Sequence, residues 1–339
     1  MSTQSSEFAS VPTPESDGQQ PPRRIGALWR RFLAYCIDCL ILGVIGHLVA
    51  WPFAESLAAM GPFARLVGFL IALLYFAVLE SYIGSGASLG KRLLLLQVVH
   101  ADGSLLTLQE SIARSIVFSL PIFLNGLALP LSRAPLAVVT LLSVVSVGVG
   151  GITGYMILFN RHTRQGLHDL SVKSFVAEGN QPGALAIRPI WTPHWFIAGA
   201  LLAIVMAAAT MVGVIVPDTE PLSQLMLDAR MAEQINGVQS ASAMRVWTRS
   251  NSRGWKLSSL AVTIHCLCKE DEEEAIADGA ARALLHGDPH FRDYPRVTII
   301  VAHGYDIGIA SSTHAQRFSY TPAGWSDRLL GASPQPESH

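Results

Sequence analysis

The stretch WRRFLAYCIDCLILGVIGHLVAWP, residues 29–52, decides the fold of this chain. It is apolar for about the length that a helix needs to cross a ~30 Å hydrocarbon core. Two arginines precede the apolar run, and Trp29 and Trp51 bracket it, as tryptophans do at membrane interfaces. The stretch therefore predicts a first transmembrane helix at residues 32–51.

Asp38 is the anomaly in this predicted helix. A carboxylate near the centre of a span costs roughly 2.5–3.5 kcal/mol on insertion scales, so it is expected to face a bundle interior, a partner or water. Arg31 and Asp38 share one helix face but are separated by ~10 Å along the helix axis. They cannot form a close ion pair within the helix, so each is expected to have a partner elsewhere.

The composition indicates a membrane protein with a soluble part. The chain has 339 residues, of which 50% are hydrophobic and 14% charged. This composition is too apolar for an ordinary soluble protein and too charged for a protein that lies entirely within the membrane. A formal net charge of −1 argues against a nucleic-acid binder.

Four further apolar runs predict transmembrane helices at residues 63–82, 115–131, 136–159 and 194–216. The run at 115–131 contains Pro121, Asn125 and Pro130, so a re-entrant element is the alternative there. Basic residues gather before the first span, between the second and third, and between the fourth and fifth. The positive-inside rule then predicts a bacterial inner-membrane protein with a cytoplasmic N-terminus and an extracytoplasmic C-terminal domain.

The remaining segments are polar. Residues 1–22 and 331–339 are expected to be disordered tails, and residues 179–193 a linker before the fifth span. Residues 217–330 show an αββαββ pattern with a hairpin about His303-Gly304, which predicts a small α+β domain with an antiparallel sheet. The expected fold class is therefore an α-helical polytopic membrane bundle of about five transmembrane helices followed by this domain.

Three motifs carry a resemblance to a known family. They are RRFLAYCID at residues 30–38, GASLGKRLLLLQVVHADGSLLTLQESIARS at 86–115, and RQGLHDLSVKSFV at 164–176. Together, and in this order, residues 24–178 resemble the RDD family of bacterial and archaeal membrane proteins. Arg31, Asp38 and Asp169 match the one arginine and two aspartates for which that family is named. Supporting matches to the family motifs are Gly90, Lys91, Arg92, Asp102, Gly103, Arg114 and His168.

The resemblance implies transport of ions or small solutes, with cation–proton exchange as one option. In that interpretation Asp38 is the titrating group, and Arg31 and Asp169 complete a polar cluster. A structural clasp that fixes helix packing is the rival interpretation of the same residues. The protein would then be a membrane scaffold or sensor whose C-terminal domain binds a protein partner. Glu80, His47 and Asn125 could extend a polar path, but each is interpreted as a packed or interfacial residue.

The sequence lacks the motifs that would indicate catalysis, cofactor binding or metal binding. The chain has no phosphate loop, nucleophile elbow or zinc-protease helix, so neither an enzyme nor a cofactor is expected. The histidines at 286, 290, 303 and 314 match no known ligand spacing, so no metal site is expected. Cys266 and Cys268 are expected to be buried thiols of one strand, because a disulfide between them needs awkward geometry.

Overall fold

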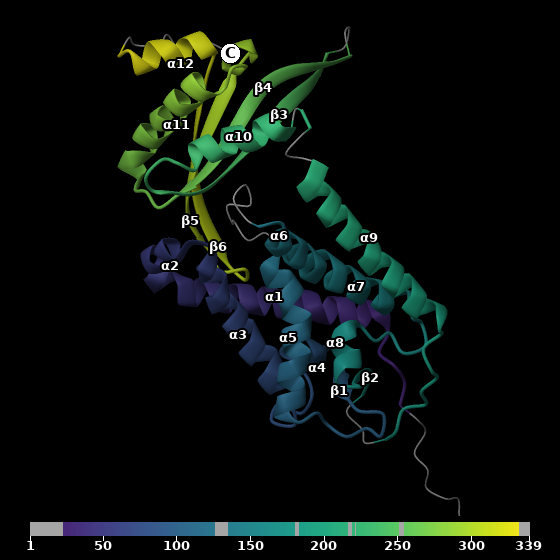
Figure 1. The fold of residues 1–339 in the computed structure, drawn as a ribbon. Coiled ribbons are helices and arrows are strands. Elements are labelled where there is room, and N and C mark those ends of the chain that lie inside the picture. The colour runs from purple at the N-terminus through teal and green to yellow at the C-terminus, as the bar shows by residue number, and fades with distance from the viewer. Residues whose placement is uncertain are drawn as a thin grey trace, which may run out of the picture.

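The structure is a computed structural model that describes residues 23–125, 135–179, 183–215, 219–220, 222–250 and 254–331. The tail predicted at residues 1–22, nearly all of the tail at 331–339 and the last part of the span at 115–131 lie outside the described residues. The described chain has a helical N-terminal part and a C-terminal part built on a sheet (Figure 1).

The first two long helices form a hairpin. α1 (Leu28–Ala50) is followed by η1 (Trp51–Phe53), α2 (Ala54–Met60) and η2 (Gly61–Phe63), and α3 (Ala64–Leu79) then returns. Pro52 and Pro62 each sit in the first turn of a short 3-10 helix. Proline is tolerated there but would interrupt a continuous α-helix. The prolines therefore divide the run of apolar residues into separate helices.

The third long helix begins at a capping box, before the predicted span at 115–131. Glu110 N donates to Thr107 Oγ1, and Thr107 N donates to the Glu110 carboxylate, which together form the capping box of α5 (Leu108–Leu124). α6 (Leu136–Ser143), the π-helical segment η3 (Val144–Val149) and α7 (Gly150–Phe159) then form one helical run, and α9 (Pro193–Ile215) follows later.

Two short helices and a small sheet close one end of this part. β1 (Leu96–Val99) pairs antiparallel with β2 (Phe175–Glu178). α4 (Leu89–Leu93) precedes β1 and packs on α1, whereas α8 (Leu167–Ser171) precedes β2 and packs on α5. The strand pairing therefore brings α4 and α8, which are far apart in the sequence, to the same end of the helices (Figure 1).

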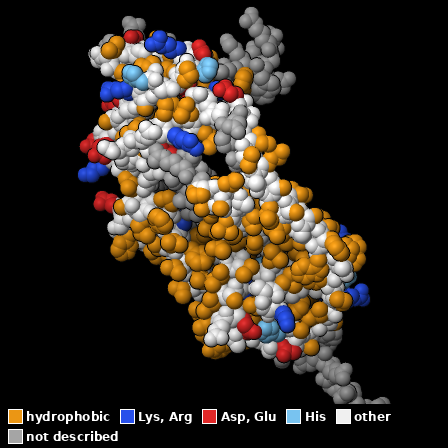
Figure 2. Space-filling view, in the orientation of Figure 1, with side chains coloured by type: hydrophobic (Ala, Val, Ile, Leu, Met, Phe, Trp, Pro, Cys, Tyr) orange, Lys and Arg blue, Asp and Glu red, His pale blue; other side chains and the backbone are white. Residues whose placement is uncertain are grey.

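Within the described residues, three helical runs are long and apolar enough to cross a membrane: Leu28–Leu79, Leu136–Phe159 and Pro193–Val212. The first run contains both α1 and α3. Large hydrophobic side chains on these helices are exposed, among them Phe32, Leu74 and Ile204. Figure 2 shows hydrophobic side chains covering the middle of the helical part. An exposed apolar surface of this kind is suited to lipid, so this part is of the membrane type.

The C-terminal domain begins with α10 (Leu222–Ala232), β3 (Val238–Ser250) and β4 (Gly254–Cys266). After η5 (Glu270–Glu272) come α11 (Glu273–Gly287), η6 (Phe291–Asp293), β5 (Val297–Asp306), β6 (Ser311–Tyr320) and α12 (Pro322–Leu329). The predicted αββαββ order is present, with α12 added. The four strands form one sheet in the order β3-β4-β5-β6, and helices α10, α11 and α12 pack their apolar residues on it.

The prediction of an antiparallel sheet is wrong for the central pair, because β4 and β5 run parallel. The chain passes through α11 between these strands, and a helical crossover of this kind returns the chain to a parallel position.

The predicted hairpin turn is also wrong. β5 and β6 are joined at residues 307–310, and His303 and Gly304 lie within β5. Gly304 is a glycine because its φ is +138° and a Cβ there would come 2.1 Å from Ser312 O.

The prediction of two free thiols in this domain is wrong as well. Cys266 and Cys268 form a disulfide with a Cα–Cα distance of 5.3 Å. β4 ends at Cys266, so Cys268 already lies beyond the strand and its side chain is free to turn towards its neighbour.

The tip of the β5–β6 hairpin packs against the helical part. Tyr305, Ile307 and Ala310 share a buried apolar cluster with Ala50, Leu57 and Ala64 of the α1–α3 hairpin. Arg65 Nη2 lies 2.5 Å from Asp306 Oδ2, which adds an ion pair to this contact. The C-terminal domain is therefore held to the helices by the hairpin as well as by the chain that follows α9.

Candidate functional site

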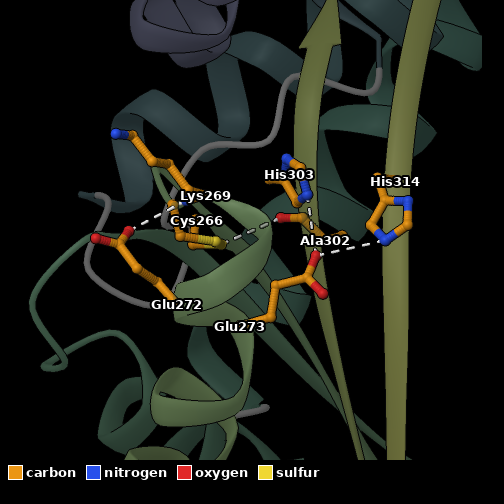
Figure 3. Close-up of a disulfide and its surroundings, with 8 residues drawn as sticks. Cys266, Lys269, Glu272, Glu273, Ala302, His303 and His314 are labelled. Carbon is orange, nitrogen blue, oxygen red and sulfur yellow. Dashed lines mark hydrogen bonds and ion pairs between the residues drawn. A yellow bond between two sulfur atoms is a disulfide. The ribbon is translucent and has the colours of Figure 1, made fainter.

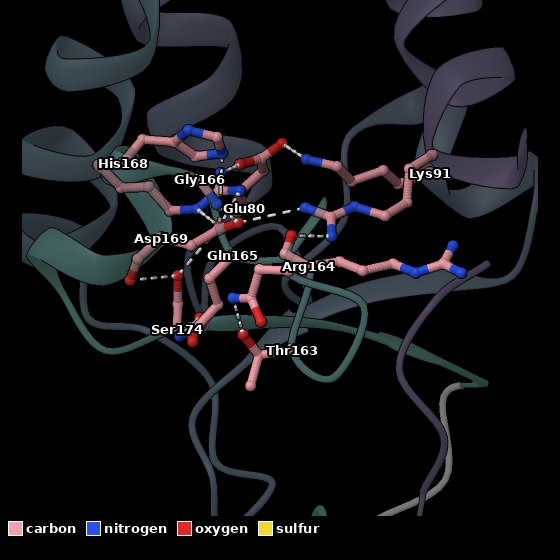
Figure 4. A network of polar contacts seen from close by, with 12 residues as sticks. Glu80, Lys91, Thr163, Arg164, Gln165, Gly166, His168, Asp169 and Ser174 are labelled. Atoms are coloured by element: carbon pink, nitrogen blue, oxygen red, sulfur yellow. Dashed lines mark hydrogen bonds and ion pairs between the residues drawn. The ribbon is translucent and has the colours of Figure 1, made fainter. Parts of the chain in front are cut away.

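A buried network of charges lies where α4 and α8 meet the long helices (Figure 4). Arg114 of α5 is at its centre. Its Nε and Nη2 donate to Asp169 Oδ1 over 3.0 and 2.7 Å, and its Nη1 donates to Glu80 Oε2. Arg114, Glu80 and Asp169 are all buried. The central guanidinium therefore joins α5 both to the end of α3 and to α8.

The network extends in both directions from Arg114. Arg31 Nη2 lies 3.2 Å from Asp169 Oδ2, and Arg31 Nη1 donates to the backbone oxygen of Arg164. At the other end Lys91 of α4 donates to Glu80 Oε1. The order of contacts is thus Arg31, Asp169, Arg114, Glu80, Lys91. Charges buried this deeply are tolerated when they are paired and hydrogen-bonded, as all five are here.

The ion pairs and the burial of the site shift the pKa values of the two titratable residues of α8. Burial raises the pKa of the Asp169 carboxyl, but the positive charges around it, those of protonated His168, Arg114 and Arg31, outweigh burial and hold that pKa below its usual range. Burial lowers the pKa of the adjacent His168 to about 3, so its ring is neutral near pH 7. The ring packs edge-on against Phe118 with 5.0 Å between centroids. His168 therefore contributes packing to the site, whereas Asp169 contributes a fixed negative charge.

Asp38 stands beside this network and does not touch Arg31. Its carboxylate accepts hydrogen bonds from Tyr75 Oη and Ser88 Oγ, each over 2.6 Å, and from Gly90 N over 2.8 Å. Its residue is only 1% exposed. A Cβ on Gly90 would come 2.2 Å from Ala34 O, so only glycine lets α4 approach α1 this closely. Asp38 therefore holds the start of α4 against α1 through neutral donors.

The structure brings most of the residues named from the sequence to this end of the bundle. Arg31, Lys91, Arg114, His168 and Asp169 gather in the network or against it, with Asp38 and Gly90 beside it. Three others lie apart. Arg92 donates to the backbone oxygens of Ala87 and Gly84. Asp102 and Gly103 form the turn after β1, where Asp102 accepts from Ser104 and Gly103 has a φ of +88°.

Glu80 contributes more to the site than the sequence predicts. The sequence indicates a packed or interfacial residue that could extend a polar path; Glu80 is indeed fully buried, and it pairs with two cations. The available signal was charge balance, since Lys91 and Arg114 in the family motifs both need an anionic partner once buried. His47 and Asn125 are outside the network: His47 contacts Gly43 O of its own helix, and the Asn125 carbonyl accepts from Arg65.

Two cavities lie along the bundle from this network. The larger has a volume of about 400 Å³; Arg31, Asp38, Glu80, Lys91 and Arg114 line its polar end, and apolar residues of α1, α5 and α7 line the rest. The smaller has a volume of about 160 Å³ and is bounded by Gly308 and Ile309 of the hairpin tip. Tyr35, Phe76 and Phe118 line both cavities. These three rings therefore stand between the charged end and the hairpin tip.

A helical part with an apolar outer surface and an inner charge network beside a cavity defines a polytopic membrane protein with a polar interior. Residues 25–173 match the model of the family described as RDD family. The resemblance to the RDD family that the three motifs predict is therefore confirmed over this region, and the C-terminal domain lies outside the match. No curated protein and no solved structure matches the chain.

Proposed function

We propose that the RDD region handles cations or small charged solutes, with cation–proton exchange at Asp38. One observation carries this proposal. Glu80 and Asp169 are each paired with two cationic side chains, whereas Asp38 accepts hydrogen bonds from two hydroxyls and one backbone amide. Asp38 also lines the larger cavity. It is therefore the carboxylate of the described site that is best suited to accept a proton or a cation.

The physical reason is the cost of burying an unpaired charge. A buried carboxylate whose hydrogen bonds come from neutral donors has no opposite charge in direct contact, and a bound cation would supply one. Tyr75 and Ser88 can reorient their hydroxyls, which act as donors to a charged carboxylate and as acceptors from a protonated one. Arg31 and Asp169, by contrast, pair with each other, and Asp169 also pairs with Arg114. We assign to these two residues the positioning of the helices around Asp38.

The membrane arrangement is part of the proposal. Five spans would be α1, α3, α5, the α6–α7 run and α9, in a bacterial inner membrane with the network near the cytoplasmic side. The basic residues Arg23, Lys91, Arg92, Arg164 and Lys173 all lie on segments at the network end, and the positive-inside rule favours the cytoplasm for them. The C-terminal domain would then be extracytoplasmic.

The test is ion-driven proton flux in proteoliposomes that contain the full-length protein. Wild type, Asp38→Asn and the matched control Asp102→Asn are compared with sodium, potassium and lithium gradients. Asp102 lies on an exposed turn, so its change should leave flux intact. We expect flux in wild type and control and none in Asp38→Asn, with all three inserted and monodisperse. Equal flux in Asp38→Asn would remove Asp38 from the mechanism, and no wild-type flux with any cation would refute exchange.

A non-transporting sensor or scaffold is the second candidate function. The contact between the β5–β6 tip and the α1–α3 hairpin favours it, because a partner bound to the C-terminal domain could change that contact. Complementation of a gene-deletion strain separates the two candidates. A sensor requires the C-terminal domain, and Asp38→Asn then matters only as far as it lowers the amount of folded protein. A transporter fails with Asp38→Asn at a normal protein level.

A further inference from the structure

Three side chains from different parts of the C-terminal domain converge beside its disulfide (Figure 3). Glu273 begins α11, and His303 and His314 lie on β5 and β6. The two histidines are directly opposite in the antiparallel pairing, with ring centroids 5.2 Å apart. One ligand atom from each of the three residues lies within 4.8 Å of the other two. We propose that Glu273, His303 and His314 bind a divalent transition-metal ion such as Zn²⁺.

The distances suit a metal ion. Glu273 Oε1 lies 2.9 Å from His303 Nε2 and 3.8 Å from His314 Nε2. Tetrahedral Zn²⁺ with bonds of about 2.0–2.1 Å separates its ligand atoms by about 3.3–3.4 Å. The distances from Glu273 Oε1 to the two histidine nitrogens lie on either side of that value, so small side-chain adjustments would place all three atoms around one ion.

The polar atoms at this place are otherwise unsatisfied. Glu273 Oε1 and His303 Nε2 are buried and face each other as an ion pair, but neither atom has a hydrogen-bond partner. The Glu273 side chain is only 1% exposed. A buried carboxylate oxygen without a hydrogen-bond donor is costly, and an ion between the two atoms removes that cost. The missing hydrogen bonds of these two buried atoms therefore add to the clustering as a reason to infer a ligand.

The site also has a side that is open to solvent. The side-chain exposure rises from 1% at Glu273 through 21% at His303 to 55% at His314. Two histidines and one carboxylate are a ligand set that zinc uses when a fourth position is left for water or substrate. Cys266 Sγ lies 3.7 Å from the backbone oxygen of Ala302, next to His303, but its disulfide leaves it no free thiolate. The site therefore consists of the nitrogen and oxygen ligands.

The experiment uses tag-free full-length protein in detergent, dialysed to equilibrium against ZnCl₂, with bound zinc measured by mass spectrometry. We expect one Zn²⁺ per chain in wild type. Glu273→Gln, His303→Ala and His314→Ala should each weaken binding at least about tenfold. Glu274→Gln and His286→Ala are matched controls on the same helix, where Glu274 pairs with Arg328 and His286 contacts Arg282 O. Both controls should bind zinc as wild type does.

A buried Glu273–His303 ion pair without a metal is the rival explanation. In that case wild type would hold no more zinc than His314→Ala, and this result would overturn the proposal. Equal binding by wild type and all three site variants would overturn it too. His314→Ala changes a half-exposed side chain, so it provides a folded variant even if Glu273→Gln unfolds. The proposal does not rest on transport at Asp38, and flux measurements leave it unaffected.

Discussion

Arg31 and Asp169, which are 138 positions apart in the chain, form an ion pair of 3.2 Å that joins α1 to α8. Both side chains are largely removed from solvent, with exposures of 10% and 0%. Since Arg114 shares the same carboxylate, the loss of one negative charge leaves two buried cations facing each other.

Asp169→Asn should therefore destabilise the bundle severely. Removing one partner of a buried ion pair costs about 3–5 kcal/mol, because the remaining charge stays uncompensated. Thermal unfolding in detergent should show a much lower midpoint than wild type. Asp102→Asn, which makes the same change on an exposed turn, should unfold like wild type. A normal midpoint for Asp169→Asn would mean that the network is not a stabilising clasp.

The C-terminal domain should lose stability as the pH rises towards neutral. Burial, followed by the nearby Asp288, raises the pKa of Asp228 to about 7 from an ordinary 3.8. The folded state thus holds a proton that the unfolded state has released, and stability falls as the pH rises through about 7. Asp228→Asn should flatten this dependence and stabilise the domain at pH 8 by about 1–3 kcal/mol. Unfolding midpoints of both proteins across this range provide the measurement, and parallel curves would contradict the assignment.

Gly68→Ala should detach the hairpin tip from the helices. A Cβ at Gly68 would lie 1.8 Å from Ile307 O, a backbone atom that cannot move without shifting the tip. Overpacking of this kind costs about 1–3 kcal/mol. Hydrogen exchange of residues 305–311 should become roughly tenfold faster or more. Gly151→Ala is the matched control, because a Cβ there meets nothing within 4 Å. Unchanged exchange in Gly68→Ala would show that the tip contact contributes little.

Thiol counting should give two reactive cysteines in the unfolded, unreduced protein and four after reduction. Cys36 and Cys39 are free, whereas Cys266 and Cys268 are paired. Because this disulfide closes a loop of only three residues, its loss should cost less than about 2 kcal/mol in the chain-entropy account. Four reactive thiols without reductant would contradict the pairing.

Apolar runs and start signals made the helices predictable. The αββαββ order follows from local features and is found as the sequence predicts. The Thr107–Glu110 capping box and the Asp102-Gly103 turn are local features too, because each involves residues that are close in the sequence. The separation of Arg31 from Asp38 followed from the rise of a helix alone. The partners that the two residues actually have could not be predicted in this way. The β1–β2 pairing brings α8 to α1, and nothing in the local sequence of either strand indicates that the two strands pair.

The C-terminal domain shows a different limit. The sequence predicts a turn at His303-Gly304, and this turn would place His303 at the tip of a shorter hairpin. The actual turn lies four residues later, and that shift sets His303 opposite His314. A register error of a few residues is thus enough to hide a cluster whose members come from two strands and a helix. Spacing along the sequence could not reveal it, since the three residues meet only through the sheet and the α11 crossover.

The position of the hairpin tip has a consequence for how the protein matures. Tyr305, Ile307 and Ala310 belong to a segment synthesised long after α1, α2 and α3, yet they complete the buried cluster at the end of those helices. A ribosome that has released only the membrane helices leaves Ala50, Leu57 and Ala64 uncovered. Final assembly of this end therefore waits for nearly the whole chain. A nascent chain stopped after α9 would leave these apolar residues uncovered, and hydrophobic surface exposed in this way is the general reason that chaperones are needed.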